Sequence, residues 1–225
     1  MLLHNLDSDF LKYLIDNHVE PEDRVPTLNE ISAELGLSVG KLREQLEVAR
    51  ALGFVSVRTR KGIRRESFNF KPSVLIGLLF SLGTGETQFK QFSQLRQAVE
   101  KSMWHEAVTH LTAQDKQELR KIVESAWQKL RCHPVHVPNG EHRHFHLKTF
   151  SRLENPFVLG LLEAYWDAYE ASELTRFVTY QYWLDVWTYH ERIVDALEVD
   201  DFDEGLKLLT EHFSLLPTVP VLENS

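Results

Sequence analysis

The sequence contains little that would place the chain in a membrane or in an oxidising compartment. Its longest apolar run, residues 74–82, is about half of the ~20 residues that a membrane-spanning helix needs. The N-terminus lacks the basic start and the small-residue cleavage site of a signal peptide. Cys132 is the only cysteine among 225 residues, which excludes an intrachain disulfide framework. We therefore expect a cytoplasmic protein without a membrane partner.

What the chain does contain is an uneven distribution of charge. The net charge is −8, and 43% of the residues are hydrophobic, as in ordinary globular proteins. Residues 24–66 hold nine Lys or Arg and five Glu, whereas residues 71–225 hold 15 basic and 22 acidic residues. Screening limits the reach of a charge to about 10 Å, so a local basic patch decides the affinity for phosphates. The pattern fits nucleic-acid contact through one face, although a solvated arginine-rich loop has the same composition.

Residues 1–70 show the element order of a winged helix-turn-helix domain. Three helices are predicted, and side-chain caps at Thr27 and Ser38 begin the second and the third. Gly36 ends the second helix, which is expected to face the core with Ile31 and Leu35. Such a turn lets two short helices cross and places the third in the DNA major groove.

A basic hairpin is predicted to follow the third helix and to form the wing. Residues 54–57 alternate like a strand, residues 58–62 form a glycine-containing tip, and a return strand begins at Ile63. Arginine and lysine at such a tip can reach phosphates or the minor groove. The residues expected to contact double-stranded DNA are Thr27, Asn29, Ser38, Val39, Lys41, Arg43, Arg58, Arg60, Lys61 and Gly62.

Residues 71–225 are predicted to form a second, all-α domain, an antiparallel helical bundle. Strand signals are absent there, and apolar residues recur at helical spacing, as in the stripe of Phe89, Phe92, Leu95 and Val99. Further helices are expected from Thr112, from about residue 141 and from residue 155. The last two are predicted at about residues 174–197 and 202–216.

Four of the 11 histidines occupy positions that allow them to meet inside this bundle. His142 and His146 are four residues apart, so both project from one face of a helix. His190 lies ten residues before Asp200 and His212 twelve after it, on two helices joined by a turn. At ~1.5 Å per residue the two rings lie at nearly equal height. Imidazoles from three helices favour a divalent transition metal, zinc first, with nickel as another candidate.

Other histidines give weaker signals. Cys132, His133 and His136 are close in sequence, but they lie in a proline-rich loop without a fourth ligand. The pair His105-Glu106 resembles a zinc-protease motif, but the next histidine is His110. Five residues rotate its side chain by about 140° around the helix, so the two cannot share one ion.

An ordered set of motifs resembles the GntR family of bacterial transcription regulators, in particular the FadR subfamily with a C-terminal FCD effector domain. In the N-terminal part these are SVGKLREQL at residues 38–46 and LGFVSVR at residues 52–58, followed by Gly62. In the C-terminal part they are LRQAVE at residues 95–100, Phe145-His146, Asn155-Pro156, His190 with residues 193–197, and Glu211-His212-Phe213.

The resemblance implies a homodimer on a palindromic operator and a metal site of one aspartate and three histidines. The three histidines correspond to His146, His190 and His212, and the family's aspartate falls at His142. A divalent ion held by four neutral imidazoles keeps its full charge of +2. We therefore expect an anionic effector, a small organic acid whose carboxylate is bound by Arg96 in the bidentate manner, although a structural ion pair is an equal alternative for this arginine.

The expected DNA-contacting residues differ from those of the family at two positions. Two arginines usual in the family fall at Asn29 and Val39, whereas Arg43 is kept. Arginine to guanine is the commonest specific base contact, so the loss of two weakens any inference of the operator sequence from relatives.

The sequence favours a ligand-gated transcription regulator over two alternatives. One is a metal-dependent enzyme, for which Glu141 and Glu163 are available as bases, and the other is a winged-helix dimer that has lost DNA binding. An enzyme would leave the basic winged helix without a role.

Overall fold

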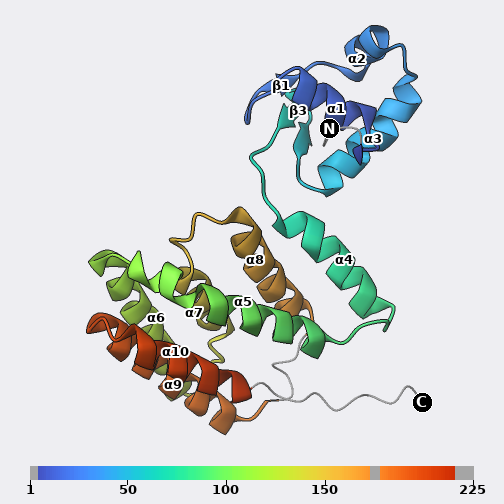
Figure 1. Ribbon diagram of the computed structural model, residues 1–225. Helices are drawn as coiled ribbons and strands as arrows, with labels where there is room; N and C mark the ends of the chain where they lie inside the picture. Colours follow the sequence, from blue (N-terminus) through green and yellow to red (C-terminus); the bar gives the residue numbers. More distant parts are fainter. Residues whose placement is uncertain (1–4, 173–177, 216–225) are drawn as a thin grey trace, which may run out of the picture. The chain divides into compact units, whose positions relative to one another are not determined.

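The structure, a computed structural model, describes residues 5–172 and 178–215 (Figure 1). The chain divides into two compact units, Met1–Ile76 and Gly77–Ser225, and helix α4 (Lys71–Gly83) begins in the first and ends in the second. No helix in the described residues combines the length and the apolar character that a membrane crossing requires.

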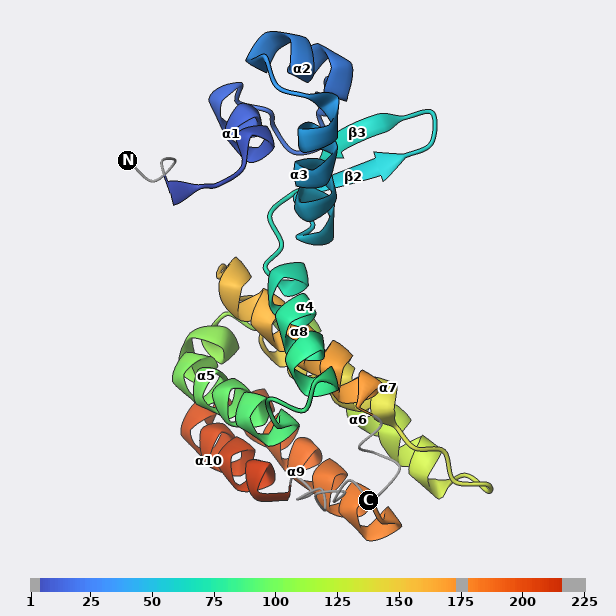
Figure 2. The same cartoon turned by 90° about the vertical axis from the view of Figure 1, so that its right-hand side faces the viewer.

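The first unit has the predicted order of three helices followed by a hairpin, with one further short strand. Its helices are α1 (Asp9–Asp16), α2 (Leu28–Leu35) and α3 (Val39–Ala51), and its strands are β1 (Arg24–Val25), β2 (Val55–Arg58) and β3 (Gly62–Arg65). The sheet is antiparallel in the order β1-β3-β2. Strands β2 and β3 form a hairpin that extends away from α3 (Figure 2).

The predicted caps explain where the helices of the first unit begin and end. The Thr27 hydroxyl accepts from the Glu30 backbone N–H, and the Glu30 carboxylate accepts from the Thr27 N–H, at 3.3 and 2.7 Å. Gly36 ends α2 with a φ of 67°, a left-handed conformation that side chains with a Cβ adopt at a cost. Ser38 caps α3 by accepting from the Lys41 N–H at 3.2 Å.

The core of the first unit joins its three helices to the sheet. The buried apolar residues are Phe10, Tyr13, Leu14, Val25, Ile31, Leu42, Leu46, Ala49, Val55 and Ile63. Leu35 was expected to face this core, but its side chain is 38% exposed. Strand β1 was not predicted, because two residues are too short to show an alternating pattern; Val25 pairs with Ile63.

The second unit is the predicted all-α bundle. Its elements are α5 (Phe89–Thr109), α6 (Ala113–Arg131), α7 (Asn139–Thr149), α8 (Pro156–Ala171), α9 (Tyr180–Glu198), α10 (Phe202–His212) and a 3-10 turn (Phe213–Leu215). Helix α9 packs against α6 and α10, α6 packs against α7, and α5 packs against α8 and α10. The predicted start of the long helix at about residue 174 and the predicted end of the last helix at residue 216 lie outside the described residues.

The inward face of α5 differs from the predicted apolar stripe. Leu95 is 47% exposed, and Phe89, Phe92 and Val99 are half-buried. The residues of α5 that are buried include polar and charged ones: Ser93, Arg96, Glu100, Trp104, Ala107 and Val108. Phe89 and Phe92 do pack against Tyr165 as the stripe predicted, but Leu95 does not face the core. Periodicity assigns charged residues to the solvent, whereas here two of them are paired with each other inside the bundle.

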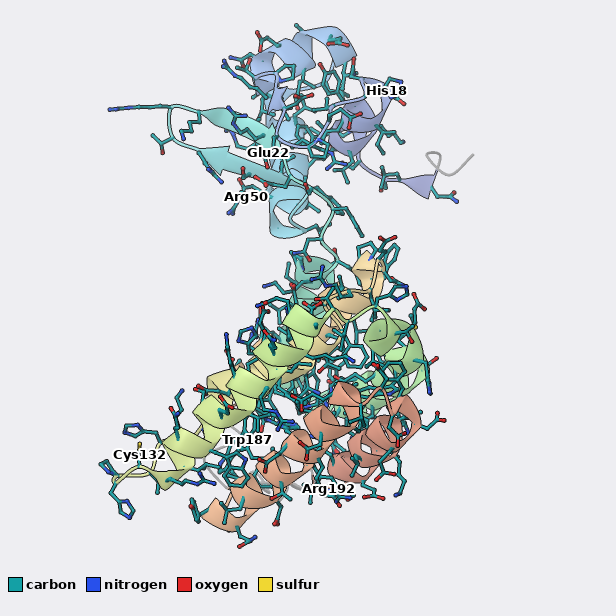
Figure 3. All side chains as sticks on the ribbon, turned by 90° about the vertical axis from the view of Figure 1, so that its left-hand side faces the viewer. His18, Glu22, Arg50, Cys132, Trp187 and Arg192 are labelled. Atoms are coloured by element: carbon teal, nitrogen blue, oxygen red, sulfur yellow. The ribbon has the colours of Figure 1, made fainter. Side chains whose placement is uncertain are left out.

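The core of the second unit is rich in large aromatic residues. Trp104, Trp166 and Trp187 are all fully buried, and Trp187 of α9 lies in the interior in Figure 3. Cys132, by contrast, is exposed in the loop that follows α6 (Figure 3). The bundle therefore offers a rigid, apolar frame for any polar group in its centre.

Candidate metal centre and DNA-binding surface

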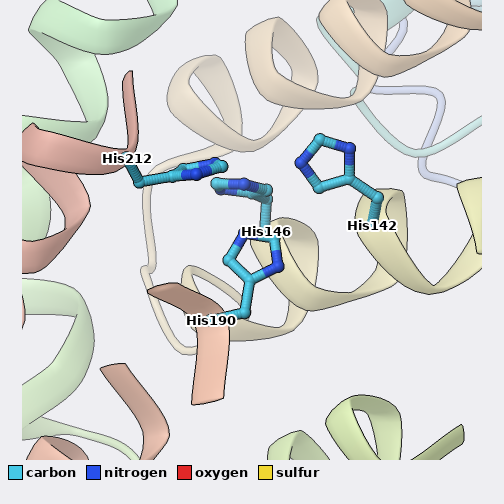
Figure 4. A group of neighbouring side chains, drawn as sticks. All are labelled: His142, His146, His190 and His212. Carbon is cyan, nitrogen blue, oxygen red and sulfur yellow. The ribbon is translucent and has the colours of Figure 1, made fainter. Parts of the chain in front are cut away.

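Three helices of the second unit bring four histidines together. His142 and His146 lie one turn apart on α7, His190 lies on α9 and His212 on α10. Their side chains are between 0 and 5% exposed. Figure 4 shows the four rings gathered in one small volume.

The distances between the rings allow one ion to reach all four. The ring centroids of His190 and His212 are 4.6 Å apart, and those of the most distant pair, His142 and His212, are 5.9 Å apart. One nitrogen from each ring lies within 4.8 Å of the others. A tetrahedral ion with bonds of ~2.1 Å holds its ligands ~3.4 Å apart, so small ring rotations suffice. The expected convergence of the rings is confirmed; the bound ion stays a prediction.

The imidazole nitrogens have the chemistry of unused ligands. Both nitrogens of His142, His146 and His190, and Nδ1 of His212, are buried without a hydrogen-bond partner. Burial lowers the pKa of all four imidazoles well below the usual 6.5, because it penalises the charged form. The rings are therefore neutral near pH 7 and carry free lone pairs. Buried polar atoms are rarely left unpaired, so this donor set fits a transition-metal ion.

Aromatic side chains enclose the four-histidine cluster. The Phe145 ring stacks on His190 with centroids 4.1 Å apart. The rings of Trp166 and Trp187 lie 4.7 and 6.4 Å from that of His142. An apolar wall of this kind lowers the local dielectric and strengthens the interaction of any ion with its ligands.

A buried ion pair on α5 adjoins this cluster. Nε and Nη2 of Arg96 donate to the two carboxylate oxygens of Glu100 at 2.9 and 3.1 Å, and both side chains are at most 1% exposed. The guanidinium lies 4.6 Å from the Tyr165 ring centroid and 5.1 Å from that of Phe213. Burial raises the pKa of Glu100, while the Arg96 charge opposes that shift. The structure thus contains the ion pair that was the alternative to an effector contact of Arg96.

Glu100, the last residue of the LRQAVE motif at residues 95–100, links this pair to the histidines. Its Oε2 lies 3.3 Å from Nδ1 of His146, although the two atoms are not aligned for a hydrogen bond. A histidine that binds metal through one nitrogen commonly donates from the other to a carboxylate. The four-residue spacing from Arg96 places Glu100 on the same face of the helix, and this spacing indicates the ion pair.

The weaker histidine signals lead to no second cluster. Among the described residues, the four histidines form the one group of metal-ligating side chains that meet. Cys132, His133, His136 and His144 are exposed. Glu141, considered as a catalytic base, is held by Lys129 at 2.7 Å and by Ser125 at 3.0 Å.

The predicted DNA contacts all lie in the first unit, on three elements. Arg43 and Lys41 are exposed on α3, and Arg58, Arg60 and Lys61 are exposed on the hairpin. Lys41 also forms an ion pair with Asp9 at 2.7 Å. Asn29 is exposed on α2, Val39 is half-buried, Thr27 and Ser38 act as helix caps, and Gly62 has a φ of 77°.

Comparison with known proteins shows which family and which solved structures this chain resembles. The profile of the FCD domain matches residues 91–215. The fold is similar to that of Streptococcus agalactiae GntR, with a TM-score of 0.64, 15% sequence identity, and coverage of 92% of this chain and 94% of that chain. It is also similar to E. coli McbR/YncC, with a TM-score of 0.50, 17% identity, and coverage of 93% and 95%. No curated protein sequence gives a significant match.

A winged helix followed by a helical FCD domain defines a class of transcription regulator. The chain belongs to the FCD-domain family and has the fold of GntR-family regulators, as the sequence motifs indicated. The family and the structural neighbours are regulators, not enzymes.

Proposed function

We propose that this chain is a homodimeric regulator of a palindromic operator. In this proposal α3 enters the major groove and the β2–β3 hairpin contacts the adjacent backbone or minor groove. A divalent transition metal ion, zinc first, is held by His142, His146, His190 and His212. A small organic acid bound at that ion changes the affinity for the operator.

The exposed basic residues of the first unit support the DNA contact. Arg43 lies on the exposed side of α3, while Leu42 and Leu46 are buried and fix the helix to the body. Three further basic side chains, Arg58, Arg60 and Lys61, are exposed on the hairpin. With Asn29 and Val39 in place of arginines, the hairpin supplies a larger share of the binding free energy than in relatives.

The single observation that carries the proposed metal and effector site is the meeting of four neutral imidazoles, each with at least one unpaired buried nitrogen, in the core of an FCD domain. A divalent ion there supplies a fixed positive charge, and expansion from four to five ligands gives a coordination position for a carboxylate oxygen. The histidines hold the ion, the aromatic walls exclude water, and Glu100 stands beside Nδ1 of His146. Arg96 binds the acid by sharing its guanidinium with Glu100.

Measurement of operator affinity with and without the metal tests the proposal. Fluorescence anisotropy with DNA fragments from the region of its own gene, at low salt, is repeated with zinc, with EDTA, and with zinc plus small carboxylates. We expect tight, salt-dependent binding to at least one fragment, and a change of at least fivefold on addition of zinc with an acid.

Two variants on the same helix sharpen this experiment. His146→Ala removes one ligand and abolishes the response to zinc, whereas His144→Ala removes an exposed imidazole on α7 and leaves the response intact. If no fragment binds at low salt, the proposed DNA-binding function is wrong. If both variants respond equally to zinc, the proposed metal site is wrong.

A further inference from the structure

The buried charges around the four-histidine cluster do not balance once a metal ion is bound. Among the described residues, the buried charged side chains are Arg96, Glu100 and Asp115. Asp115 is held by Lys148 at 2.7 Å and by Arg152 at 2.8 Å. Glu100 is neutralised by Arg96. Four neutral imidazoles contribute no charge, so a divalent ion leaves the interior with two uncompensated positive charges.

The hydrogen-bonding groups of the same region are also unbalanced, because several buried donors have no acceptor. The indole nitrogens of Trp166 and Trp187 are buried without a partner, and an indole N–H can only donate. Both rings pack against His142. Each neutral imidazole that binds a metal through one nitrogen carries its proton on the other, and His142 and His190 have no acceptor for that proton. The Glu100 carboxylate stands beside His146, and Tyr169, whose hydroxyl is unpaired, lies near His142. The remaining unpaired donors, at Trp166, Trp187, His142 and His190, still outnumber these acceptors.

We infer that the four-histidine centre takes up its metal ion together with an organic dianion, a dicarboxylate, rather than with a monocarboxylate. This inference rests on the proposed metal site and specifies its effector. One carboxylate compensates one of the two charges, and an uncompensated buried charge is costly. A second carboxylate compensates the other and supplies oxygens to the unpaired donors. An aspartate at position 142 would compensate one of the two positive charges. The neutral His142 therefore sets the preference for a dicarboxylate over a monocarboxylate.

Calorimetric titration of the full-length zinc-loaded protein tests this preference. Succinate, malonate and sulfate are compared with acetate and with the monomethyl ester of succinate, which matches succinate in size but carries one charge. We expect at least one of the two dicarboxylates to bind at least tenfold more tightly than both monoanions, and tenfold more tightly to the zinc-loaded than to the metal-free protein. Because linkage is reciprocal, the same dicarboxylate raises the zinc affinity by that factor.

The variant His142→Asp exchanges a neutral ligand for an anionic one at the same position. It is expected to bind zinc at least as tightly as the original chain without added anion, and to lose the preference for the dicarboxylate by about tenfold. Trp187→Phe keeps an aromatic ring and deletes one unpaired donor, so it weakens dicarboxylate binding without changing the affinity for zinc alone. Trp127→Phe deletes another buried, unpaired indole N–H, on α6, and serves as the matched control.

The outcomes separate this inference from the proposed function. If zinc binds but succinate and its monoester bind with equal affinity, the preference for a dianion is wrong and the metal site stays intact. If sulfate binds tightly and neither dicarboxylate does, the ligand is an inorganic dianion, and the inference of a dicarboxylate is wrong. If no zinc binds, the metal site itself fails. A preference for the dicarboxylate that survives in folded His142→Asp would overturn the role of His142.

Discussion

The ring centroids of His190 and His212 lie 4.6 Å apart, although 22 positions of the sequence separate the two residues. Helices α9 and α10 run antiparallel from a turn at Asp200, which holds a positive φ of 58°. Trp104 of α5 donates to the Phe202 carbonyl at 2.8 Å and so fixes the start of α10. The height of the two imidazoles is therefore set by the turn and not by the loops at the far end.

Loss of one of these two rings should disrupt the metal site. His212→Asn removes the imidazole while keeping a polar side chain, and we expect the zinc affinity to fall by about 100-fold or more, since three neutral ligands remain. Competition with a chromogenic chelator measures the affinity. His110→Asn, at the exposed end of α5, is the control and should bind zinc like the original chain. Equal affinities in the two variants would exclude His212 as a ligand.

The Arg96–Glu100 pair should be costly to break from one side. Glu100→Gln leaves the Arg96 charge buried beside a neutral amide, and we expect a loss of about 3 kcal/mol in the free energy of unfolding. The double variant Arg96→Met with Glu100→Leu removes both charges and should be more stable than the single variant. Urea unfolding followed by circular dichroism measures both. A loss under ~1 kcal/mol for Glu100→Gln would show that water reaches the pair.

Asp115 should make the stability of the second unit depend on acid. Its carboxylate accepts from Arg152 and Lys148 and from the Thr112 N–H, at 2.8, 2.7 and 2.8 Å. Hydrogen bonds from Arg152, then from Lys148 and Thr112, hold the pKa of Asp115 far below its usual value despite burial.

A carboxylate whose pKa is lower in the folded than in the unfolded state stabilises the fold at any pH above the unfolded-state pKa of ~3.9. This stabilisation is lost as the pH falls from there toward the folded-state pKa. Asp115→Asn should therefore cost about 2–3 kcal/mol at pH 7, and the difference from the original chain should shrink below pH ~4. Urea unfolding at the two pH values measures it. Glu154→Gln, on the exposed surface, is the control. A difference that is independent of pH would contradict an ionised Asp115.

The DNA contacts of α3 and of the hairpin should differ in kind. Arg43→Ala removes a side chain that the proposal places at the base edges, and should cost about 1–3 kcal/mol on the best operator with little effect on non-specific DNA. Lys61→Ala should weaken binding to all sequences and reduce the slope of log affinity against log salt by about 1. Anisotropy titrations at several salt concentrations measure both. Lys121→Ala, on α6, should change neither, and an unchanged affinity in all three variants would exclude this surface.

The sequence predicted those parts of the fold that local chemistry determines. Thr27, Ser38 and Thr112 cap helices as expected, because each hydroxyl accepts from a backbone N–H within its own first turn. The meeting of the histidines was also predictable, because helical rise and a short turn fix the relative height of His190 and His212.

The unpredicted parts depend on pairing between residues that pattern reading treats separately. Periodicity assigned the buried face of α5 wrongly because Arg96 and Glu100 are charged, and only their mutual contact, an alternative considered for Arg96, allows both to be buried. Trp166 gave no separate signal either, since an aromatic residue on a core helix has the same pattern whether it packs against leucine or against His142. Tertiary neighbours, and not periodicity, give these residues their place at the site.

X-ray absorption spectroscopy of the zinc-loaded, full-length protein tests the central claim most directly, because it counts the ligands of the ion. We expect one zinc per chain, with nitrogen ligands at ~2.0 Å and the multiple-scattering pattern of four imidazoles. Sulfur at ~2.3 Å would place the ion at Cys132, and fewer than three imidazoles would show that the histidine cluster does not hold it. Either result would contradict the account.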